Sequence, residues 1–306
     1  MMDALADHAT RTIRAGSKSF SAASRLFEPD TRRSAVLLYA WCRHCDDVID
    51  GQRLGMEQAG AASTAQERLA ELEDATRRAY CGEQMNDPAF AAFQAVAIKH
   101  AIPQRHALDH LRGFAMDVEE RRYLRIEDTL EYCYHVAGVV GVMMAIIMGA
   151  RDEPTLDRAS DLGIAFQLTN IARDIIEDAA IGRCYLPADW LEEFRISPHE
   201  LGQRRHRPAV AVMAKRLVEM AEPYYVSALQ GLPALPPRSA WAVATAHGVY
   251  REIGVKVVER GEQAWDSRTF TSRADKLRLV ARGGWQVWAA RRREPTPRPA
   301  LFRRPR

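Results

Sequence analysis

Residues 161–178 read DLGIAFQLTNIARDIIED. Their apolar side chains recur at helical spacing, which predicts one buried face of an α-helix. Oxygen-bearing side chains recur beside that face every three or four residues, at Gln167, Asn170, Asp174 and Asp178. This stretch therefore predicts a core helix that carries a row of polar groups facing its neighbours.

A second acidic helix is predicted from about Thr31 to Asp50. Beside its apolar stripe runs a second stripe, with Asp47 next to it, made of Tyr39, Arg43, Asp46 and Asp50. Carboxylates four residues apart repel each other, and the helix dipole disfavours them at a C-terminal end. A bound divalent cation would offset this repulsion, and the alternative is an acidic helix end that is simply exposed to solvent.

The donor types indicate which metal would bind. Oxygen ligands without His or Cys suit Mg²⁺ or Mn²⁺, and Mg²⁺ completes its shell with water and substrate phosphates. Two acidic helices therefore predict a diphosphate held through metal ions, with the ligands Asp46, Asp47, Asp50, Asn170, Asp174 and Asp178. Arg43 and Arg173 are predicted to contact the phosphates. The alternative is that they pair with the same aspartates, which is compatible with the first interpretation before substrate arrives.

Composition and charge restrict the class of protein. The chain has 306 residues, 47% of them hydrophobic and 27% charged, and no series of alternating strands, which predicts one all-α domain over residues 1–290. Residues 291–306 hold seven Arg and one Glu, so the rest of the chain carries a net charge of about −3. That balance argues against nucleic-acid binding. The Pro/Arg tail is predicted to be a disordered extension that could contact anionic lipid.

One long uncharged run raises the question of a membrane span. Residues Tyr132–Ala150 contain no formal charge, and the length of this run is close to what a membrane-spanning helix needs. The run opens on polar side chains and contains three glycines, so a helix buried among other helices is favoured over a span. The five cysteines are an odd number and no signal peptide is evident, which predicts a cytoplasmic protein.

Several motifs resemble those of one family. The sequences YAWCRHCDDVID at 39–50 and QLTNIARDIIED at 167–178 resemble the two aspartate-rich signatures of the squalene/phytoene synthase family. The sequences SKSF at 17–20, YCYHVAG at 132–138 and RCYLP at 183–187 resemble its N-terminal motif, its central helix and the loop after the second signature. The resemblance runs nearly end to end and is strongest to the bacterial members that make phytoene.

The resemblance implies an all-helical isoprenoid-synthase bundle with one central cavity for two prenyl diphosphates. It implies head-to-head condensation of two geranylgeranyl diphosphates, through prephytoene diphosphate, to phytoene, the first committed step of carotenoid biosynthesis. Mg²⁺ or Mn²⁺ would assist diphosphate departure from the aspartates, and no NADPH is expected. The implied partners are a membrane surface contacted peripherally and neighbouring enzymes of the carotenoid pathway.

The resemblance also assigns roles to residues. Catalytic roles are implied for Tyr39, Arg43, Asp46, Asp50, Arg173, Asp174 and Asp178. Substrate-binding roles are implied for Ser19, Phe20, Tyr132, Val136, Gln167, Asn170, Tyr185, Tyr250 and Arg268. Carbocations need an apolar wall with aromatic faces, for which the candidates are Phe20, Tyr39, Tyr132 and Tyr250.

Two alternatives remain open from the sequence. Within the family, a squalene or dehydrosqualene synthase would act on farnesyl diphosphate, and squalene formation would need a nicotinamide reductant, for which no dinucleotide motif is present. Outside the family, a helical Mg²⁺-dependent nucleoside-triphosphate pyrophosphohydrolase also uses carboxylate pairs, typically spaced by three residues.

Overall fold

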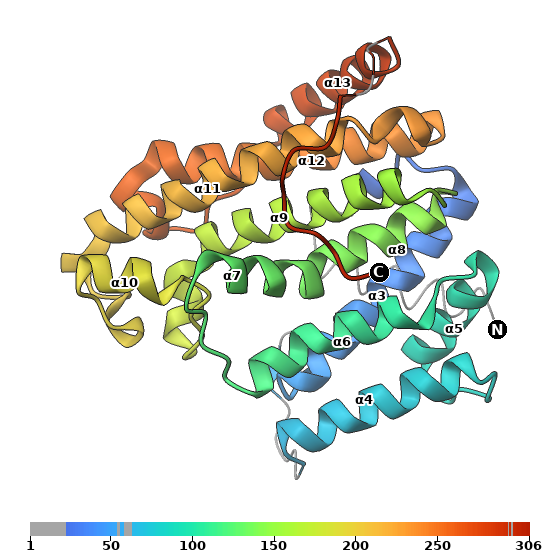
Figure 1. Cartoon of the computed structure of the whole chain (residues 1–306), viewed down its shortest axis with the longest axis horizontal. Helices are drawn as coiled ribbons and strands as arrows, with labels where there is room; N and C mark the ends of the chain where they lie inside the picture. Colours follow the sequence, from blue (N-terminus) through green and yellow to red (C-terminus); the bar gives the residue numbers. More distant parts are fainter. Residues whose placement is uncertain (1–22, 54–55, 58–62, 293, 295) are drawn as a thin grey trace.

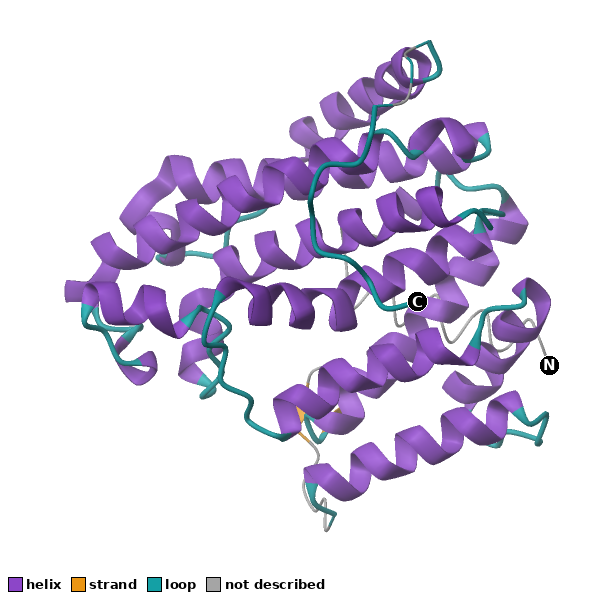
Figure 2. Cartoon of the chain, viewed as in Figure 1, coloured by secondary structure: helices purple, strands orange, loops and turns teal. Residues whose placement is uncertain are grey.

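The computed structural model is a bundle of helices, and it describes residues 23–53, 56–57, 63–292, 294 and 296–306 (Figures 1 and 2). Its α-helices are α3 (Pro29–Ile49), α4 (Ala65–Tyr80), α5 (Pro88–His100), α6 (Gln104–Val118), α7 (Ile126–Cys133), α8 (Val139–Ile147), α9 (Glu153–Ala180), α10 (Ala188–Phe194), α11 (Arg207–Leu229), α12 (Pro237–Arg260) and α13 (Arg273–Ala290). Short helical turns are η1 (Tyr134–Gly138), η2 (Pro198–Glu200), η3 (Arg204–His206), η4 (Leu232–Ala234) and η5 (Gly261–Trp265). The described residues form only two short strands, β1 (Gln52–Arg53) and β2 (Met56–Glu57), which pair antiparallel. The all-α prediction is confirmed.

Helix α9 lies at the centre of the bundle, with α11 and α12 on one side and α8 on the other (Figure 1). It begins where the Asp152 side chain accepts a hydrogen bond from the Thr155 amide at 2.9 Å, with a proline in its first turn. The predicted stripe is buried, since Ile164, Leu168 and Ile171 are at most 2% exposed. The acidic helix recognised in the sequence is thus the core helix of the molecule.

Glycines allow α9 to approach its neighbour backbone to backbone. A Cβ atom on Gly163 would lie 2.2 Å from the Ala137 carbonyl oxygen, and one on Gly141 would lie 2.3 Å from the Ala159 carbonyl oxygen. No side chain fits there, because both obstacles are main-chain atoms. The glycines of the uncharged run therefore hold it against α9.

The uncharged run is a core helix. Helix α7, the π-helical turn η1 and α8 follow one another, and within the described residues Ile126–Ile147 is the one helix long and apolar enough to cross a membrane. In its most apolar stretch 67% of the residues are buried, and the helix packs between α6 and α9. The prediction of a buried helix is confirmed.

The predicted disorder of the C-terminal tail is wrong for its last residues. They run as an extended segment across α9 (dark red in Figure 1). Arg298 donates to both carboxylate oxygens of the fully buried Asp161, at 2.9 and 2.6 Å. Arg304, itself 5% exposed, pairs with Asp157 at 2.7 Å and with Glu153. The composition of the tail could not predict this order, because the acidic partners of its arginines lie on α9.

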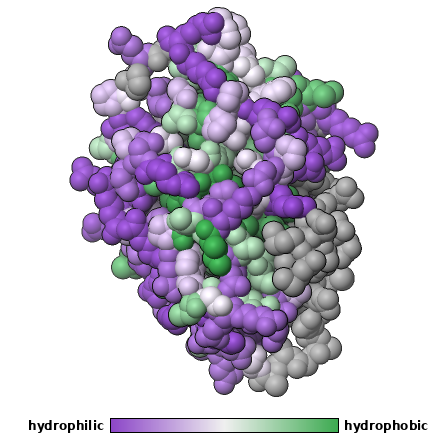
Figure 3. Space-filling view, turned by 90° about the vertical axis from the view of Figure 1, so that its right-hand side faces the viewer, coloured by the Kyte–Doolittle hydropathy of each residue, from purple (hydrophilic) through white to green (hydrophobic). Residues whose placement is uncertain are grey.

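Figure 3 shows the end of the bundle that lies on the right in Figure 1. Polar residues dominate its margins, and apolar residues show between them near its centre.

Candidate active site

A cavity of about 340 Å³ lies between α3, α8, α9 and α12. Its walls are mostly apolar, with Val136, Val140, Met144 and Leu162 among the lining side chains. Near the acidic row of α9 the lining is polar, with Tyr39, Gln167, Asn170 and Tyr250, and Thr155 and Arg158 line the cavity toward the start of α9. The hydrocarbon chain of an amphiphilic ligand would fit the apolar part, with its polar head group beside the aspartates.

Aromatic rings line the cavity near this polar end. Phe166 stacks on Tyr250 with ring centroids 4.1 Å apart and an interplanar angle of 21°. Burial raises the pKa of Tyr39 to about 12, so its hydroxyl stays neutral. Phe166 was absent from the predicted site, although it lies one helical turn before Asn170 and the same periodicity could have indicated it.

Each acidic row includes an arginine that is already paired. On α3, Arg43 contacts Asp46 at 2.8 Å and Asp47 at 2.7 Å. On α9, the Arg173 Nε donates to Asp174 at 2.7 Å. Both arginines thus pair with neighbouring aspartates, as the alternative interpretation had it, and phosphate would have to compete for them.

Arg183 joins the two rows. It lies in the loop after α9 and donates to the Asp50 carboxylate of α3 at 2.5 Å. Its charge also lowers the pKa values of Asp46 and Asp178, opposing their burial. Both acidic rows therefore lie near this one cation. Arg183 belongs to the RCYLP motif but was not among the predicted site residues, because its contact with α3 depends on the fold.

Two of the carboxylates are electrostatically disfavoured as anions. Burial raises the pKa of Asp46 to about 6, with Arg43 opposing it and Asp50 and Asp47 adding repulsion. Burial and the neighbouring Asp174 raise the pKa of Asp178 to about 7. Such groups gain from a bound cation, because it offsets both the desolvation and the mutual repulsion.

The donor set fits Mg²⁺ that shares its shell with a substrate. Among the described residues no three His, Cys, Asp or Glu side chains form a ready-made metal cluster. Each helix instead offers a pair of carboxylates, Asp46 with Asp50 and Asp174 with Asp178, all oxygen donors. One or two carboxylates per ion, completed by water and phosphate, is the usual pattern for Mg²⁺.

A half-buried carboxylate that the sequence analysis did not single out lies beside Arg183. Asp117, near the end of α6, accepts hydrogen bonds from the hydroxyls of Tyr132 and Tyr185, both at 3.1 Å. The two tyrosine rings stack with centroids 4.5 Å apart. Burial raises the pKa of Asp117 to about 6, although Arg183 and both hydroxyls oppose the shift. Tyr132 therefore belongs to this cluster, and its predicted role as a ring that faces the carbocation stays a prediction.

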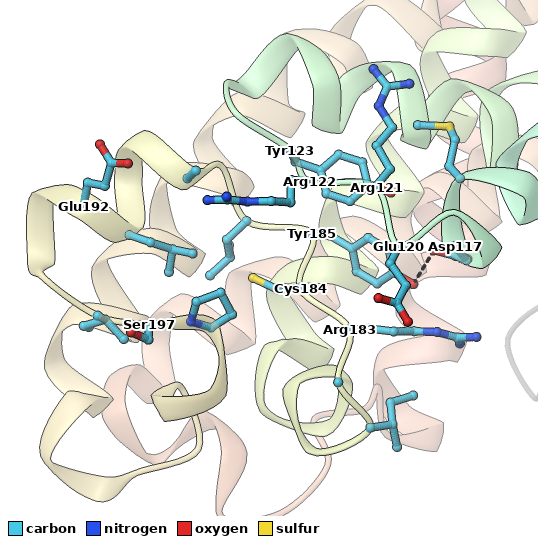
Figure 4. A pocket seen from close by; sticks show the side chains of 18 residues that line it. Asp117, Glu120, Arg121, Arg122, Tyr123, Arg183, Cys184, Tyr185, Glu192 and Ser197 are labelled. Carbon is cyan, nitrogen blue, oxygen red and sulfur yellow. Dashed lines mark hydrogen bonds between the residues drawn. The ribbon is translucent and has the colours of Figure 1, made fainter.

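A second, open pocket of about 640 Å³ borders this cluster from outside the loop (Figure 4). Figure 4 shows Tyr185 bonded to Asp117, with the Arg183 side chain extending along the same side of the pocket. The loop that carries Arg183 and Tyr185 thus borders the open pocket and, through Arg183, contacts Asp50 in the first acidic row.

The remaining predicted residues are accounted for as follows. Arg268 is 61% exposed at its side chain and contacts Asp174 at 3.5 Å and Glu177 at 3.2 Å, at the rim of the acidic site as the resemblance implied. The predicted Ser19 and Phe20 lie outside the described residues.

Comparisons with known proteins agree with this architecture. A sequence model of the squalene/phytoene synthase family matches residues 13–277. The chain is 58% identical over 303 residues to a phytoene synthase of Pseudescherichia vulneris and 57% identical over 303 residues to a 15-cis-phytoene synthase of Pantoea ananas, covering 98% of each chain in both cases. A crystal structure of a dehydrosqualene synthase superposes with a TM-score of 0.84 at 26% identity, covering 94% of this chain and 98% of that one. The chain belongs to the squalene/phytoene synthase family.

Proposed function

We propose that this protein condenses two molecules of geranylgeranyl diphosphate to phytoene. The observation that carries the proposal is the near full-length identity of 57–58% to enzymes named phytoene synthase. The site supports it, because two carboxylate pairs and three arginines adjoin a deep apolar cavity. Such a cavity suits a substrate with a long hydrocarbon chain and a highly charged head.

The charged end would bind and activate the diphosphates. Bound Mg²⁺, held by the two carboxylate pairs, would neutralise diphosphate charge and make that group a better leaving group. Arg43, Arg173 and Arg183 would exchange an aspartate partner for phosphate oxygens and hold the departing group in place. Tyr185, fixed by Asp117, would keep the covering loop closed over it.

The apolar end would protect the cations. Loss of the first diphosphate leaves an allylic cation, which the double bond of the second substrate attacks, and loss of a proton closes a cyclopropane ring. Departure of the second diphosphate, rearrangement and loss of another proton then give the central double bond of phytoene. Phe166, Tyr250 and Tyr39 offer ring faces to the positive charge, and the apolar walls exclude water that would quench it.

The comparisons bear differently on the two alternative functions that the sequence left open. Family membership sets aside the nucleoside-triphosphate pyrophosphohydrolase. A dehydrosqualene synthase shares the fold at 26% identity, far below the identity to the phytoene synthases. The C15 substrate is therefore the alternative that the product assay must exclude.

The test is product identification with purified protein. Incubated with detergent-dispersed geranylgeranyl diphosphate and Mg²⁺, the protein should release phytoene at a rate that NADPH leaves unchanged. Chelation should abolish the reaction, and Mg²⁺ or Mn²⁺ should restore it. A preference for farnesyl diphosphate, or strict NADPH dependence, would contradict the proposal and favour a squalene-type product.

A further inference from the structure

Helix α13 lies at the edge of the bundle, and among the described residues it packs mainly on α12 (Figure 1). Its inner face is buried through Leu279, Gly283 and Val287. A Cβ atom on Gly283 would lie 3.1 Å from the Thr245 amide nitrogen, so the two helices are in close contact. The opposite face of α13 is left uncovered by the described residues.

That outer face carries large apolar side chains. Leu277, Trp285 and Trp288 are 74%, 63% and 47% exposed, and Phe270, just before the helix, is 72% exposed. The two tryptophan rings stack with centroids 4.6 Å apart. The Arg292 guanidinium lies 3.8 Å above the Trp288 ring. Four of the nine large apolar side chains exposed in the described structure therefore fall on this one segment.

The same segment is strongly basic. Between Arg273 and Arg292 the sequence has six basic residues and one acidic residue. That acid, Asp275, is engaged by Lys256 at 2.5 Å. Arg273 and Arg282 are exposed and form no ion pair with any described residue. The outer face of α13 thus combines exposed indole rings with uncompensated positive charge.

We propose that the outer face of α13 docks on an anionic phospholipid bilayer. Indole rings favour the boundary between headgroups and acyl chains, and exposed arginines are attracted to anionic headgroups. Charge complementarity favours a lipid surface over a second copy of the chain, because two copies of this basic face would repel each other.

The geometry links this surface to the site, and in that respect the proposal rests on the proposed function. Phe270 lies two residues from Arg268, which contacts Asp174 at the rim of the acidic rows. Docking through Phe270 and α13 would bring this rim close to a bilayer in which C20 substrates and a C40 product are dissolved.

This docking surface differs from the one predicted from the sequence, which was the C-terminal Pro/Arg tail. Arg298 and Arg304 are paired with carboxylates of α9, so they are not available to headgroups. The tail is a structural element in this part of its length, and α13 supplies the free basic and aromatic groups.

Sedimentation with vesicles tests the docking surface. The full chain should bind phosphatidylcholine vesicles containing one quarter phosphatidylglycerol, and bind pure phosphatidylcholine at least about tenfold more weakly. The double variant Trp285→Ser/Trp288→Ser should lose at least about tenfold in affinity for the anionic vesicles. The matched control Ile98→Ser/Leu124→Ser, which removes exposed apolar side chains elsewhere, should bind within about twofold of the wild type.

Fluorescence provides a second readout that needs no variant. Brominated acyl chains in the anionic vesicles should quench tryptophan emission of the wild type, and the double variant should show little quenching. Wild-type binding retained in the double variant, or no quenching of the wild type, would overturn the proposal. A wild-type dimer that the double variant converts to a monomer, without vesicle binding, would overturn it in favour of a self-association surface.

Activity in detergent separates this proposal from the proposed function. The double variant should make phytoene from detergent-dispersed substrate at the wild-type rate, since the tryptophans lie outside the cavity and the acidic rows. Failure of the wild type itself to make phytoene would contradict the proposed function and leave the vesicle result standing.

Discussion

We expect single carboxylates of the acidic rows to decide whether the diphosphate can leave. The variants Asp50→Asn and Asp174→Asn keep the side-chain shape and remove one charge each. We expect kcat to fall at least about a hundredfold in either variant, because the developing charge is stabilised mainly in the transition state. The measurement is the rate of phytoene formation at saturating Mg²⁺, with circular dichroism to confirm an intact fold.

The control for these variants is an acid outside the site. Glu73 lies on the exposed side of α4 and pairs with Arg77 at 2.8 Å, so Glu73→Gln should leave kcat within about twofold of the wild type. If Asp174→Asn kept more than about a third of the wild-type turnover, α9 would not carry the diphosphate site.

Asp117 is expected to act by positioning its neighbours. The variant Asp117→Asn keeps an acceptor oxygen for one tyrosine but loses the charge that faces Arg183. We expect about a tenfold fall in kcat with the KM for substrate little changed. A double-mutant cycle with Tyr185→Phe should be non-additive, because both changes loosen the same contact. Additive losses would show that Asp117 and Tyr185 act independently.

The sequence could indicate some of these residues and not others. The carboxylate pairs are local, since residues four apart in a helix share a face: Asp174 and Asp178 lie on α9, and Asp46 lies on α3, which Asp50 caps at its C-terminal end. Asp117 meets tyrosines 15 and 68 positions away, and Arg183 meets a carboxylate 133 positions away. No periodicity encodes contacts of that kind, because they depend on how α6 and the loop after α9 pack.

At the scale of elements, the C-terminal segment is expected to stabilise α9. Arg298 is the cation that compensates Asp161, whose side chain is fully buried. The variant Arg298→Ala leaves that carboxylate with Ser227 and the attraction of the nearby Arg158 but without its ion pair, which should lower the free energy of unfolding by about 3 kcal/mol. Urea denaturation followed by circular dichroism measures the change.

Arg303 offers the matched control for this prediction. It lies in the same segment, is exposed and forms no ion pair with the described residues, so Arg303→Ala should change stability by less than about 0.5 kcal/mol. Equal stabilities of the Arg298 and Arg303 variants would show that the ion pair between Arg298 and Asp161 does not stabilise the fold.

Elements defined by local chemistry could be predicted better than those defined by contacts. Prolines mark helix starts correctly, with Pro88 and Pro237 as the first residues of α5 and α12. The tail was predicted as disordered because its Pro/Arg composition has no apolar periodicity. Its order comes instead from acids on α9, at a distance of more than 130 residues in sequence.

For the whole molecule, buried histidines predict a stability that depends on pH. Burial lowers the pKa of His110 and of His247 to about 4, against an ordinary value of 6.5. Between these values the unfolded chain binds protons that the folded chain does not, so each histidine contributes stability above about pH 6.5 that is lost as the pH falls toward 4. The half-buried acids Asp46, Asp117 and Asp178, whose pKa values are raised, act in the opposite direction over the same range.

The histidine contribution is therefore best measured as a difference between proteins. His247 donates from Nε2 to the Tyr225 carbonyl oxygen at 3.1 Å, and its Nδ1 has no hydrogen-bond partner among the described residues. The variant His247→Gln can keep the donor and cannot be protonated. Between pH 7.5 and 4.5 it should lose about 2–3 kcal/mol less stability than the wild type in urea titrations. The exposed His199 serves as control, since His199→Gln should follow the wild-type pH profile. A His247→Gln profile parallel to that of the wild type would mean that His247 is protonated as readily in the folded chain as in the unfolded one.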